Sequence, residues 1–427
     1  NMTALCGLFY GIQKMANTDI KWFSFDNLNA PQLSNTWGCL VDLLDACLVN
    51  GFGAQTVASI VISDGVGIAT FNNSHSIKQF QVVEFSGANE PALNSEFKVL
   101  GLTANTIEFL IDLPDQTATG TISCKLAPLG WTKVFSGTQK AVYQAKDIVS
   151  NPYFLRVDNS RDPVYTDTYA KFAKVGLLES CAGIDDVSGN QVPFDTTNPT
   201  KNWVGTGSGT SAISGWFKWK YASATVSGSF RPETTAPGNS NREWLIVGNA
   251  SGFYILTTVE TEVGYSWAKV VMGVGICRKR DIATPFLLAY NQGSSANTAQ
   301  YFQNPLLLSG YANFAFIRNV KGVLANNNIF GTLFGAMSTY SGYAGTVQQD
   351  SNDGDVFTDI LIKDPSNFLA GVADLAKYVL HDSSTDADVR FVINNGRAYL
   401  YCRTATNVTT GASTMIKTAL AFDLGEI

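Results

Sequence analysis

The chain has 427 residues, of which 45% are hydrophobic and only 15% are charged, with a formal net charge of −6. Its length is enough for two or three domains of ordinary size, and its hydrophobic fraction excludes a disordered chain. The acidic balance disfavours binding to nucleic acid. Two histidines, His75 and His381, are too few for a multi-histidine metal centre or for most histidine-dependent catalysis. Low charge with abundant Gly, Ser, Thr and Asn is typical of β-rich extracellular or virion-surface proteins.

Seven cysteines are widely spaced and form no Cys-x-x-Cys pair, which predicts free thiols in a protein made in a reducing cytoplasm. No apolar run approaches the ~18 residues that would suggest a membrane span. Residues 1–14 precede Met15 and lack the basic start of a secretory signal. We interpret them as an N-terminal extension that packs on a neighbouring subunit.

The first predicted element is a short helix that ends near Gly51, which can act as a helix stop. Its apolar face is formed by four residues at helical spacing: Leu40, Leu44, Cys47 and Leu48. The hydroxyl and amide oxygens of residues 34–36 are the expected N-cap. This is the only helix that we expect in the N-terminal half.

Residues 54–127 predict a small β module, because short strands alternate there with turn residues at regular spacing. The Asp64-Gly65 dipeptide tolerates positive φ at both central positions of a hairpin. The expected strands are residues 56–63, 66–71, 80–85, 96–100, 106–111 and 120–125. Strands of this length and spacing indicate a barrel or a sandwich.

The remainder of the chain also predicts a mainly β structure, with a loop-rich stretch at residues 183–215. Strands are expected at residues 216–222, 243–247, 253–258 and 267–278, with a terminal hairpin around Asn395-Gly396. A short helix is expected at residues 365–373. The predicted organisation is an extension with the helix (1–53), the small β module (54–127), a β-rich domain (128–300) and a C-terminal β-rich region (301–427). The fold class is therefore mainly β, with small barrel or sandwich modules and one short N-terminal helix.

Two acidic segments have the residue types that bind a hard cation. Asp350, Asn352, Asp353 and Asp355 surround a glycine, but their spacing differs from an EF-hand, so a solvated acidic turn is the alternative. His381 and the three aspartates up to Asp388 form the second segment, which a polar loop explains equally well. Neither segment indicates a cofactor, and none is expected.

A third segment alternates aromatic and basic residues between Trp216 and Tyr221. An interaction platform built from Trp216, Trp219 and Trp244 is one interpretation, suited to stacking on sugars. A strand with an aromatic core face is the other, because a period of two places Phe217 and Trp219 on one face and Lys218 on the other.

Catalytic motifs are not found in the sequence. The nucleophile elbow Gly-x-Ser-x-Gly and the phosphate-binding Walker loop do not occur. Gly205-Thr-Gly-Ser-Gly209 has the composition of a phosphate-cradling loop but lacks a strand before it and a helix after it, which favours a surface loop. The basic run Arg278-Lys-Arg280 is interpreted as a solvated strand end or a subunit contact. We therefore expect that the chain is not an enzyme.

The small β module resembles a β domain that is common in structural proteins of tailed bacteriophages. The resemblance rests on Val57-Ala-Ser-Ile60, Val82-Val-Glu-Phe-Ser-Gly-Ala88, Pro91-Ala-Leu-Asn94 and Ala118-Thr-Gly-Thr-Ile122, followed by Ala127-Pro-Leu-Gly-Trp131 and Lys140-Ala-Val-Tyr143. With the preceding Leu44-Asp-Ala-Cys-Leu-Val-Asn-Gly51 it covers about residues 20 to 160. The chain departs from the pattern at Ser76, where the family has Gly, and at Phe80-Gln81, where it has Gly-Asp.

The resemblance implies a structural component of the virion, in the tail or baseplate, that acts by subunit assembly and carries no catalytic residues. Its expected partners are other virion proteins and copies of itself, with no nucleic acid and no membrane span. Three alternatives stay open. They are a receptor- or glycan-binding virion protein, a head-decoration or head-fibre protein, and a polysaccharide-degrading enzyme carried on the virion, which needs a pair of facing carboxylates.

Overall fold

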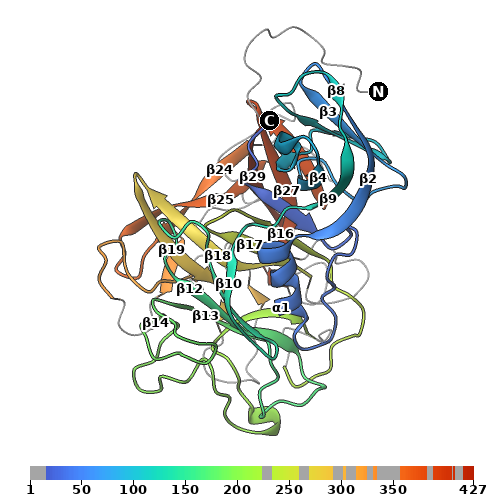
Figure 1. Cartoon of the computed structure of the whole chain (residues 1–427). Coiled ribbons are helices and arrows are strands. Elements are labelled where there is room, and N and C mark those ends of the chain that lie inside the picture. The colour runs from blue at the N-terminus through green and yellow to red at the C-terminus, as the bar shows by residue number, and fades with distance from the viewer. Residues whose placement is uncertain are drawn as a thin grey trace.

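The computed structural model describes residues 16–223, 233–258, 269–291, 302–303, 314–324, 330–333, 356–381, 388–405, 407–408 and 417–427. Within these ranges the chain forms three large antiparallel sheets, a pair of short strands, β21 (Phe302–Gln303) and β28 (Asn407–Val408), and one helical segment near the N-terminus (Figure 1). The prediction of a mainly β fold with one short N-terminal helix is confirmed. The predicted domain boundaries stay a prediction.

The helical segment begins as α1 (Cys39–Leu44) and continues as a π-helical turn, η1 (Asp45–Asn50). It ends at Gly51, whose φ of 70° suits glycine, as predicted. The predicted N-cap is wrong: the side chain of Asn159 caps the helix, and its Oδ1 accepts bonds from the N–H groups of Gly38 (2.9 Å) and Leu40 (3.1 Å). A residue 119 positions away from Leu40 therefore replaces the local cap.

The small β module is a curled sheet that lies at one end of the molecule (Figure 1). Its strands pair in the order β5 (Glu96–Lys98), β4 (Val82–Ala88), β9 (Gly120–Leu126), β2 (Phe52–Ser63), β3 (Val66–Phe71), β7 (Thr106–Leu110) and β6 (Gly101–Leu102), with β8 (Gln116–Thr117) on β2. The two edges of the curled sheet come together as a small barrel, because Leu100, between β5 and β6, donates to the carbonyl of Glu108 in β7 and Phe97 of β5 contacts Phe109 of β7. The rings of Phe85, Phe97 and Phe109 pack in its interior in tilted arrangements, with centroids 4.6–5.9 Å apart.

A second sheet has one apolar and one charged face. Its order is β10 (Thr132–Gly137), β11 (Lys140–Gln144), β12 (Phe154–Asp158), β13 (Lys171–Leu178), β15 (Phe217–Ala222) and β20 (Tyr290–Asn291), with β14 (Gln191–Val192) on β13. Leu155, Val175 and Trp219 on the apolar face belong to the same buried core as the barrel interior and the helix. Charged side chains occupy the other face.

The third sheet is large and curls back on itself. Its order is β1 (Lys21–Ser24), β16 (Trp244–Gly248), β17 (Phe253–Thr257), β18 (Val270–Lys279), β19 (Ile282–Leu288), β22 (Phe314–Ala315), β23 (Phe330–Leu333), β24 (Val356–Lys363), β25 (Leu369–His381), β29 (Lys417–Glu426), β27 (Arg397–Ala405) and β26 (Val389–Asn394). An additional pairing of β18 with β25 closes one ring of strands. The edge strands β1 and β26 meet through Trp22 and Phe391, whose rings lie 5.4 Å apart.

Phe80, one of the two departures from the phage pattern, packs on this contact between edges. Its ring lies 5.2 Å from that of Phe391, and its φ of 63° is the conformation that favours glycine. The neighbouring Gln81 is fully buried and donates to the carbonyl of Trp22 in β1. This connection of the small barrel therefore fastens it to the third sheet.

The hairpins predicted at Asp64-Gly65 and Asn395-Gly396 are confirmed, and all four residues have positive φ. The helix predicted at residues 365–373 is wrong. A turn at residues 365–367 leads instead into β25, which pairs with β24, β29 and β18. Tertiary pairing outweighs the helix propensity of its Ala and Leu residues.

Candidate functional site

Among the described residues, many of the buried charged side chains lie on the second face of the sheet β10–β20. Lys140, Asp158, Lys174 and Lys218 are consecutive cross-strand neighbours on β11, β12, β13 and β15. They face away from the core because each alternates with an apolar residue along its strand. Asp158, Lys174 and Lys218 are exposed by 3% or less, since loops cover this face.

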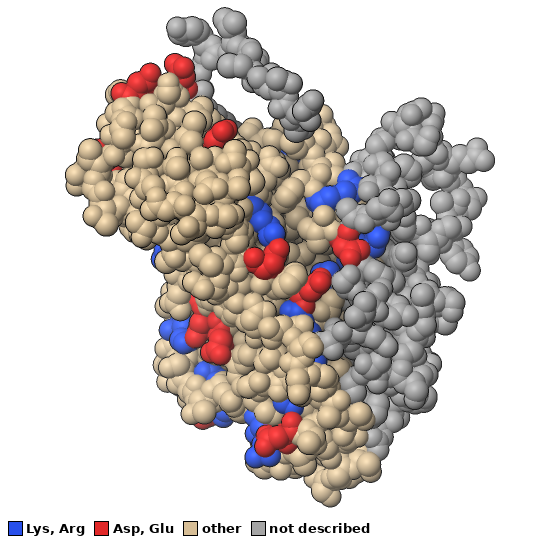
Figure 2. Space-filling model, turned by 90° about the vertical axis from the view of Figure 1, so that its right-hand side faces the viewer, with Lys and Arg blue, Asp and Glu red and all other residues tan. Residues whose placement is uncertain are grey.

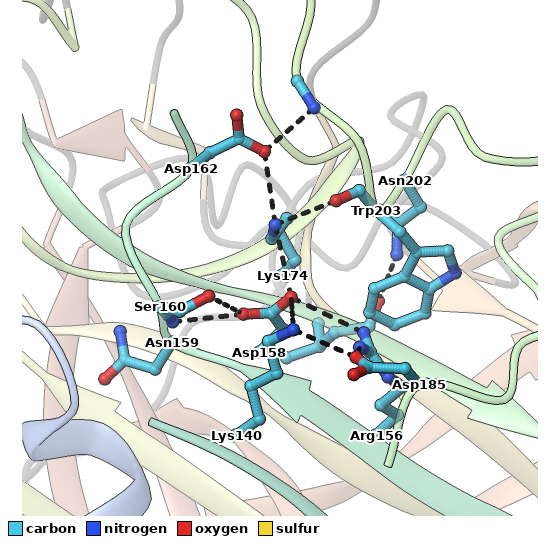
Figure 3. Close-up of polar contacts among 12 residues, drawn as sticks. Lys140, Arg156, Asp158, Asn159, Ser160, Asp162, Lys174, Asp185, Asn202 and Trp203 are labelled. Carbon is cyan, nitrogen blue, oxygen red and sulfur yellow. Dashed lines mark hydrogen bonds and ion pairs between the residues drawn. The ribbon is translucent and has the colours of Figure 1, made fainter. Parts of the chain in front are cut away.

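Lys174 is held by two carboxylates and a carbonyl (Figure 3). Its Nζ lies 3.3 Å from Asp158 and 3.4 Å from Asp162, and it donates to the carbonyl oxygen of Trp203 at 2.9 Å. Asp162 also accepts a bond from the N–H of Gly205 at 2.9 Å. The cluster therefore fastens two covering loops to one strand.

Gly205, the first residue of the glycine-rich motif, has a structural role in this contact. A Cβ at this position would lie 2.4 Å from Asp162 Oδ1, so only glycine permits the approach. The motif lies in a loop and ends in a short 3-10 turn, η3 (Gly209–Ser211), as the sequence indicates for a surface loop rather than a phosphate cradle.

Arg156 extends the cluster toward the loop at residues 183–192. Its Nη2 donates to Asp185 at 2.9 Å, its Nε donates to the carbonyl of Ile184 at 2.8 Å, and its guanidinium lies 4.3 Å from the ring centroid of Trp203 (Figure 3). Trp203 in turn donates its indole N–H to Gln191 at 2.7 Å. A buried arginine with a carboxylate, a carbonyl and an aromatic face fixes both loops in position.

Two lysines of β15 share a buried carboxylate at the other end of this face. Glu233 lies 2.8 Å from Lys218 and 2.5 Å from Lys220, and it accepts a bond from the hydroxyl of Tyr165 at 2.5 Å. Burial, together with the charge of Lys220, lowers the pKa of Lys218 to about 7. Burial would raise the pKa of Glu233, but the two ammonium groups outweigh it and lower that pKa to about 2. The pKa of Lys218 therefore lies near neutral pH.

The polar contacts of this face hold the covering loops on the sheet. Its carboxylates accept bonds from ammonium, guanidinium, hydroxyl or backbone N–H groups. The same oxygens would be needed to bind a cation or to accept a proton from a substrate. Within the described ranges no group of three or more His, Cys, Asp or Glu residues is placed to hold a metal ion. The predicted cation site at Asp350, Asn352, Asp353 and Asp355 lies outside the described residues.

The predicted interaction platform is not on the surface. Trp216 is 5% exposed, and Trp219 and Trp244 are fully buried in the core that joins the helix, the barrel and the sheets. Their indole groups serve the fold: Trp219 donates to the carbonyl of Leu288 and Trp244 to that of Pro31, each at 2.8 Å. The alternative, a strand with an aromatic core face, is the correct one for β15.

Sequence reasoning missed the charged cluster. One signal was available, because Lys218 and Lys220 alternate with aromatic residues and so must share a face. The covering loops and Glu233 could not be inferred, since they come from distant parts of the chain. Charged residues on a strand are ordinarily solvated, which is the opposite of what the structure shows here.

Comparisons with known proteins give limited information. No family model matches the chain, and no curated protein matches its sequence. Among solved structures, a chain titled phage phi92 endosialidase is similar with a TM-score of 0.17 and 8% identity, over 88% of this chain and 52% of that one. The chain thus spans about half the length of that protein, and a likeness at this level defines neither its fold nor its activity. In the parts of the chain that are described, no helix has the length and apolar character to cross a membrane.

Proposed function

We propose that this chain is a structural component of a bacteriophage particle, in its tail or baseplate, and that it acts by subunit assembly rather than by catalysis. The observation that carries the proposal is a pair of exposed aliphatic side chains on the outer face of the small barrel, next to Glu108 of β7. Val61 of β2 and Ile68 of β3 are cross-strand neighbours that are 46% and 38% exposed. Large exposed apolar side chains that are grouped in this way mark interaction surfaces.

The surroundings of this pair support a protein partner. Thr117 of β8 is the next neighbour of Val61, and Leu102 of β6 is 42% exposed on the same barrel. Protein interfaces favour such apolar and uncharged polar groups over lysine-rich surface. The barrel is also the part of the chain that carries the resemblance to tailed-phage structural proteins.

The experiment is incorporation of the chain into purified particles. Quantitative mass spectrometry of particles should detect the full chain at a fixed copy number, and a cryo-EM map should place it in the tail or baseplate. The substitutions Val61→Ser and Ile68→Ser together should reduce incorporation about tenfold or more, because they remove buried apolar area from the contact.

Val149→Ser is the matched control, since Val149 is 91% exposed and lies outside the barrel. It should be incorporated like the unchanged chain. Particles that lack the chain would refute the virion assignment. A map density at the head would replace the tail or baseplate assignment with a head-decoration role.

A further inference from the structure

The far end of the small barrel is acidic. Between residues 52 and 126 the chain has seven acidic residues against three lysines: Asp64, Glu84, Glu90, Glu96, Glu108, Asp112 and Asp115 against Lys78, Lys98 and Lys125. Each lysine bonds to a residue outside the barrel, namely Asp26, the carbonyl of Leu424 and the carbonyl of Asn50. Glu84 and Glu96 pair with Lys125 and Lys21. Among the described residues, the acidic side chains of the barrel without a lysine or arginine partner are therefore Asp64, Glu90, Glu108, Asp112 and Asp115.

Three exposed aspartates make up this acidic tip: Asp64, Asp112 and Asp115. Asp115 accepts bonds from the N–H of Asp64 at 2.8 Å and from the hydroxyl of Ser63 at 3.5 Å, so the β2–β3 turn and the loop after β7 lie together. Within the described residues none of the three aspartates forms an ion pair with a lysine or arginine. Figure 2 shows acidic side chains without basic ones at the upper end, where Figure 1 places β3 and β8. Val61 and Ile68 adjoin this tip.

A second surface has the opposite charge and is also apolar. The turn between β18 and β19 exposes Lys279, Arg280 and Asp281, and it is followed by Ile282, which is 56% exposed. Lys279 donates to the carbonyl of Leu369 at 3.5 Å, which brings the turn before β25 to the same place. We call this surface the basic patch.

The basic patch continues into the loop at residues 318–324. The ammonium of Lys321 lies 4.1 Å from the ring centroid of Phe368, which is 41% exposed, and Val323 beside it is 58% exposed. Lys279, Arg280 and Lys321 have no carboxylate partner among the described residues, and Asp281 is the one acidic residue of the turn. The patch thus combines a net positive charge with three large exposed apolar side chains.

We infer that the acidic tip of one molecule docks on the basic patch of a second copy of this chain. The two surfaces match in both respects, because each joins unpaired charge of one sign to exposed aliphatic or aromatic side chains. Figure 1 places β3 and β8 at the upper right and β19 at the left, so the two surfaces do not meet within one molecule. The overall charge of −6 makes a nucleic-acid partner for this patch unfavourable.

A contact between two different surfaces is head-to-tail. Such contacts close into a ring when the rotation between subunits allows it and otherwise extend into a filament. Both outcomes give repeated copies of one chain, which is what a tail or baseplate component requires. The inference rests on the proposed function and names the partner of the barrel surface.

The test is self-association of the full chain, measured by sedimentation velocity at low and high salt. The unchanged chain should associate, and high salt should weaken the association because the charges are exposed. Glu108→Lys with Asp112→Lys reverses charge at and beside the tip, and Lys279→Glu with Lys321→Glu reverses the patch. Each double variant should raise the dissociation constant by about tenfold or more.

A mixture of the two double variants provides the decisive measurement. The reversed tip of one is complementary to the reversed patch of the other, so the mixture should associate again while each variant alone does not. Lys146→Glu with Arg161→Glu is the control for the patch reversal, because it changes the net charge by the same amount and both residues are exposed and lie outside the two surfaces. It should associate as the unchanged chain does.

A monomeric unchanged chain, or association that neither reversal weakens, would overturn the inference. Binding to phosphatidylglycerol vesicles that Lys279→Glu with Lys321→Glu abolishes, without any self-association, would assign the patch to an anionic lipid instead. If the chain is present in particles but does not self-associate, the inference is wrong and the proposed function still holds. If the chain self-associates but is missing from particles, the proposed function is wrong and the contact between copies still holds.

Discussion

Lys218 and Lys220 both place an ammonium group beside the single carboxylate of Glu233, in a part of the protein that excludes water. Because desolvation disfavours the charged form of an amine, the pKa of Lys218 falls to about 7 in the folded chain. In the unfolded chain a lysine has a pKa of about 10.4. The residue therefore links folding to pH.

The number of protons that Lys218 binds in the folded and in the unfolded chain determines how the free energy of unfolding changes with pH. Between about pH 7 and pH 10 the unfolded chain binds more protons at Lys218 than the folded chain, so this residue makes the free energy of unfolding rise with pH. Lys218→Met removes the titrating amine and should therefore remove that part of the slope. Urea unfolding of both proteins from pH 6.5 to 9.5 measures it. Lys171 and Lys98, whose pKa values are lowered to about 8, contribute equally to both curves.

Glu233→Gln is the contrasting variant at the same site. It leaves two lysines buried without their shared carboxylate, and breaking a buried ion pair costs about 3–5 kcal/mol. An unchanged pH slope in Lys218→Met would show that this residue does not titrate in the range given by the structure.

Among the elements, the helical segment is determined partly by residues within it and partly by a residue that is distant in the sequence. The helix, its apolar face and its stop at Gly51 follow from residues within one stretch of sequence, and so do the Asp64-Gly65 and Asn395-Gly396 hairpins. The cap from Asn159 does not, because it comes from the end of β12. The strand β25 differs from prediction for the same reason: its partners β18, β24 and β29 decide its conformation.

The charged cluster could be predicted only in part. Alternation within β15 separates Lys218 and Lys220 from the aromatic core face, but nothing near them in sequence indicates that Glu233 and the loops at 159–170 and 200–205 cover them. Burial of charge depends on what packs over a strand, and a period of two cannot reveal that. The prediction of a tryptophan platform is wrong for the same reason, because residue type alone does not show whether a side chain lies in the core or on the surface.

Gly51→Ala tests the end of the helical segment. A Cβ there would lie 2.3 Å from the carbonyl oxygen of Leu126, and the φ of 70° disfavours alanine. We expect a loss of about 1–3 kcal/mol in the free energy of unfolding. Gly183→Ala is the control, since a Cβ at that position meets nothing within 4 Å. It should change the unfolding free energy by less than about 0.5 kcal/mol. Equal losses in the two variants would contradict this account of Gly51.

For the whole molecule, the contact of β1 with β26 joins the two edge strands of the third sheet, in addition to the ring of strands that the β18–β25 pairing closes. Trp22 and Phe391 bridge the two edge strands in an edge-to-face contact, and Phe80 of the small barrel packs on Phe391. No backbone pairing between β1 and β26 is described, so side chains carry this contact.

A double-mutant cycle on Trp22→Ala and Phe391→Ala measures how strongly the edges are joined. Aromatic pairs of this geometry couple by about 0.5–1.5 kcal/mol beyond their burial. Chemical unfolding of the two single variants and the double variant gives this coupling energy. A cycle on Trp22 and Tyr399, which packs against Phe357 in a separate core cluster, should give a smaller value. Additive losses at Trp22 and Phe391 would mean that the two edges lie together without stabilising each other.

The pairing of β1 with β16 and the bond from Lys98 to the carbonyl of Leu424 join residues that are far apart in the order of synthesis. On the ribosome, β1 has no strand partner until residues 245–248 have emerged, and the bond from Lys98 of the small barrel cannot form until β29 has been made. High contact order of this kind slows folding and leaves strand edges open during translation. Synthesis of β29, rather than any local step, therefore sets the time at which this part of the molecule becomes competent to join its neighbours.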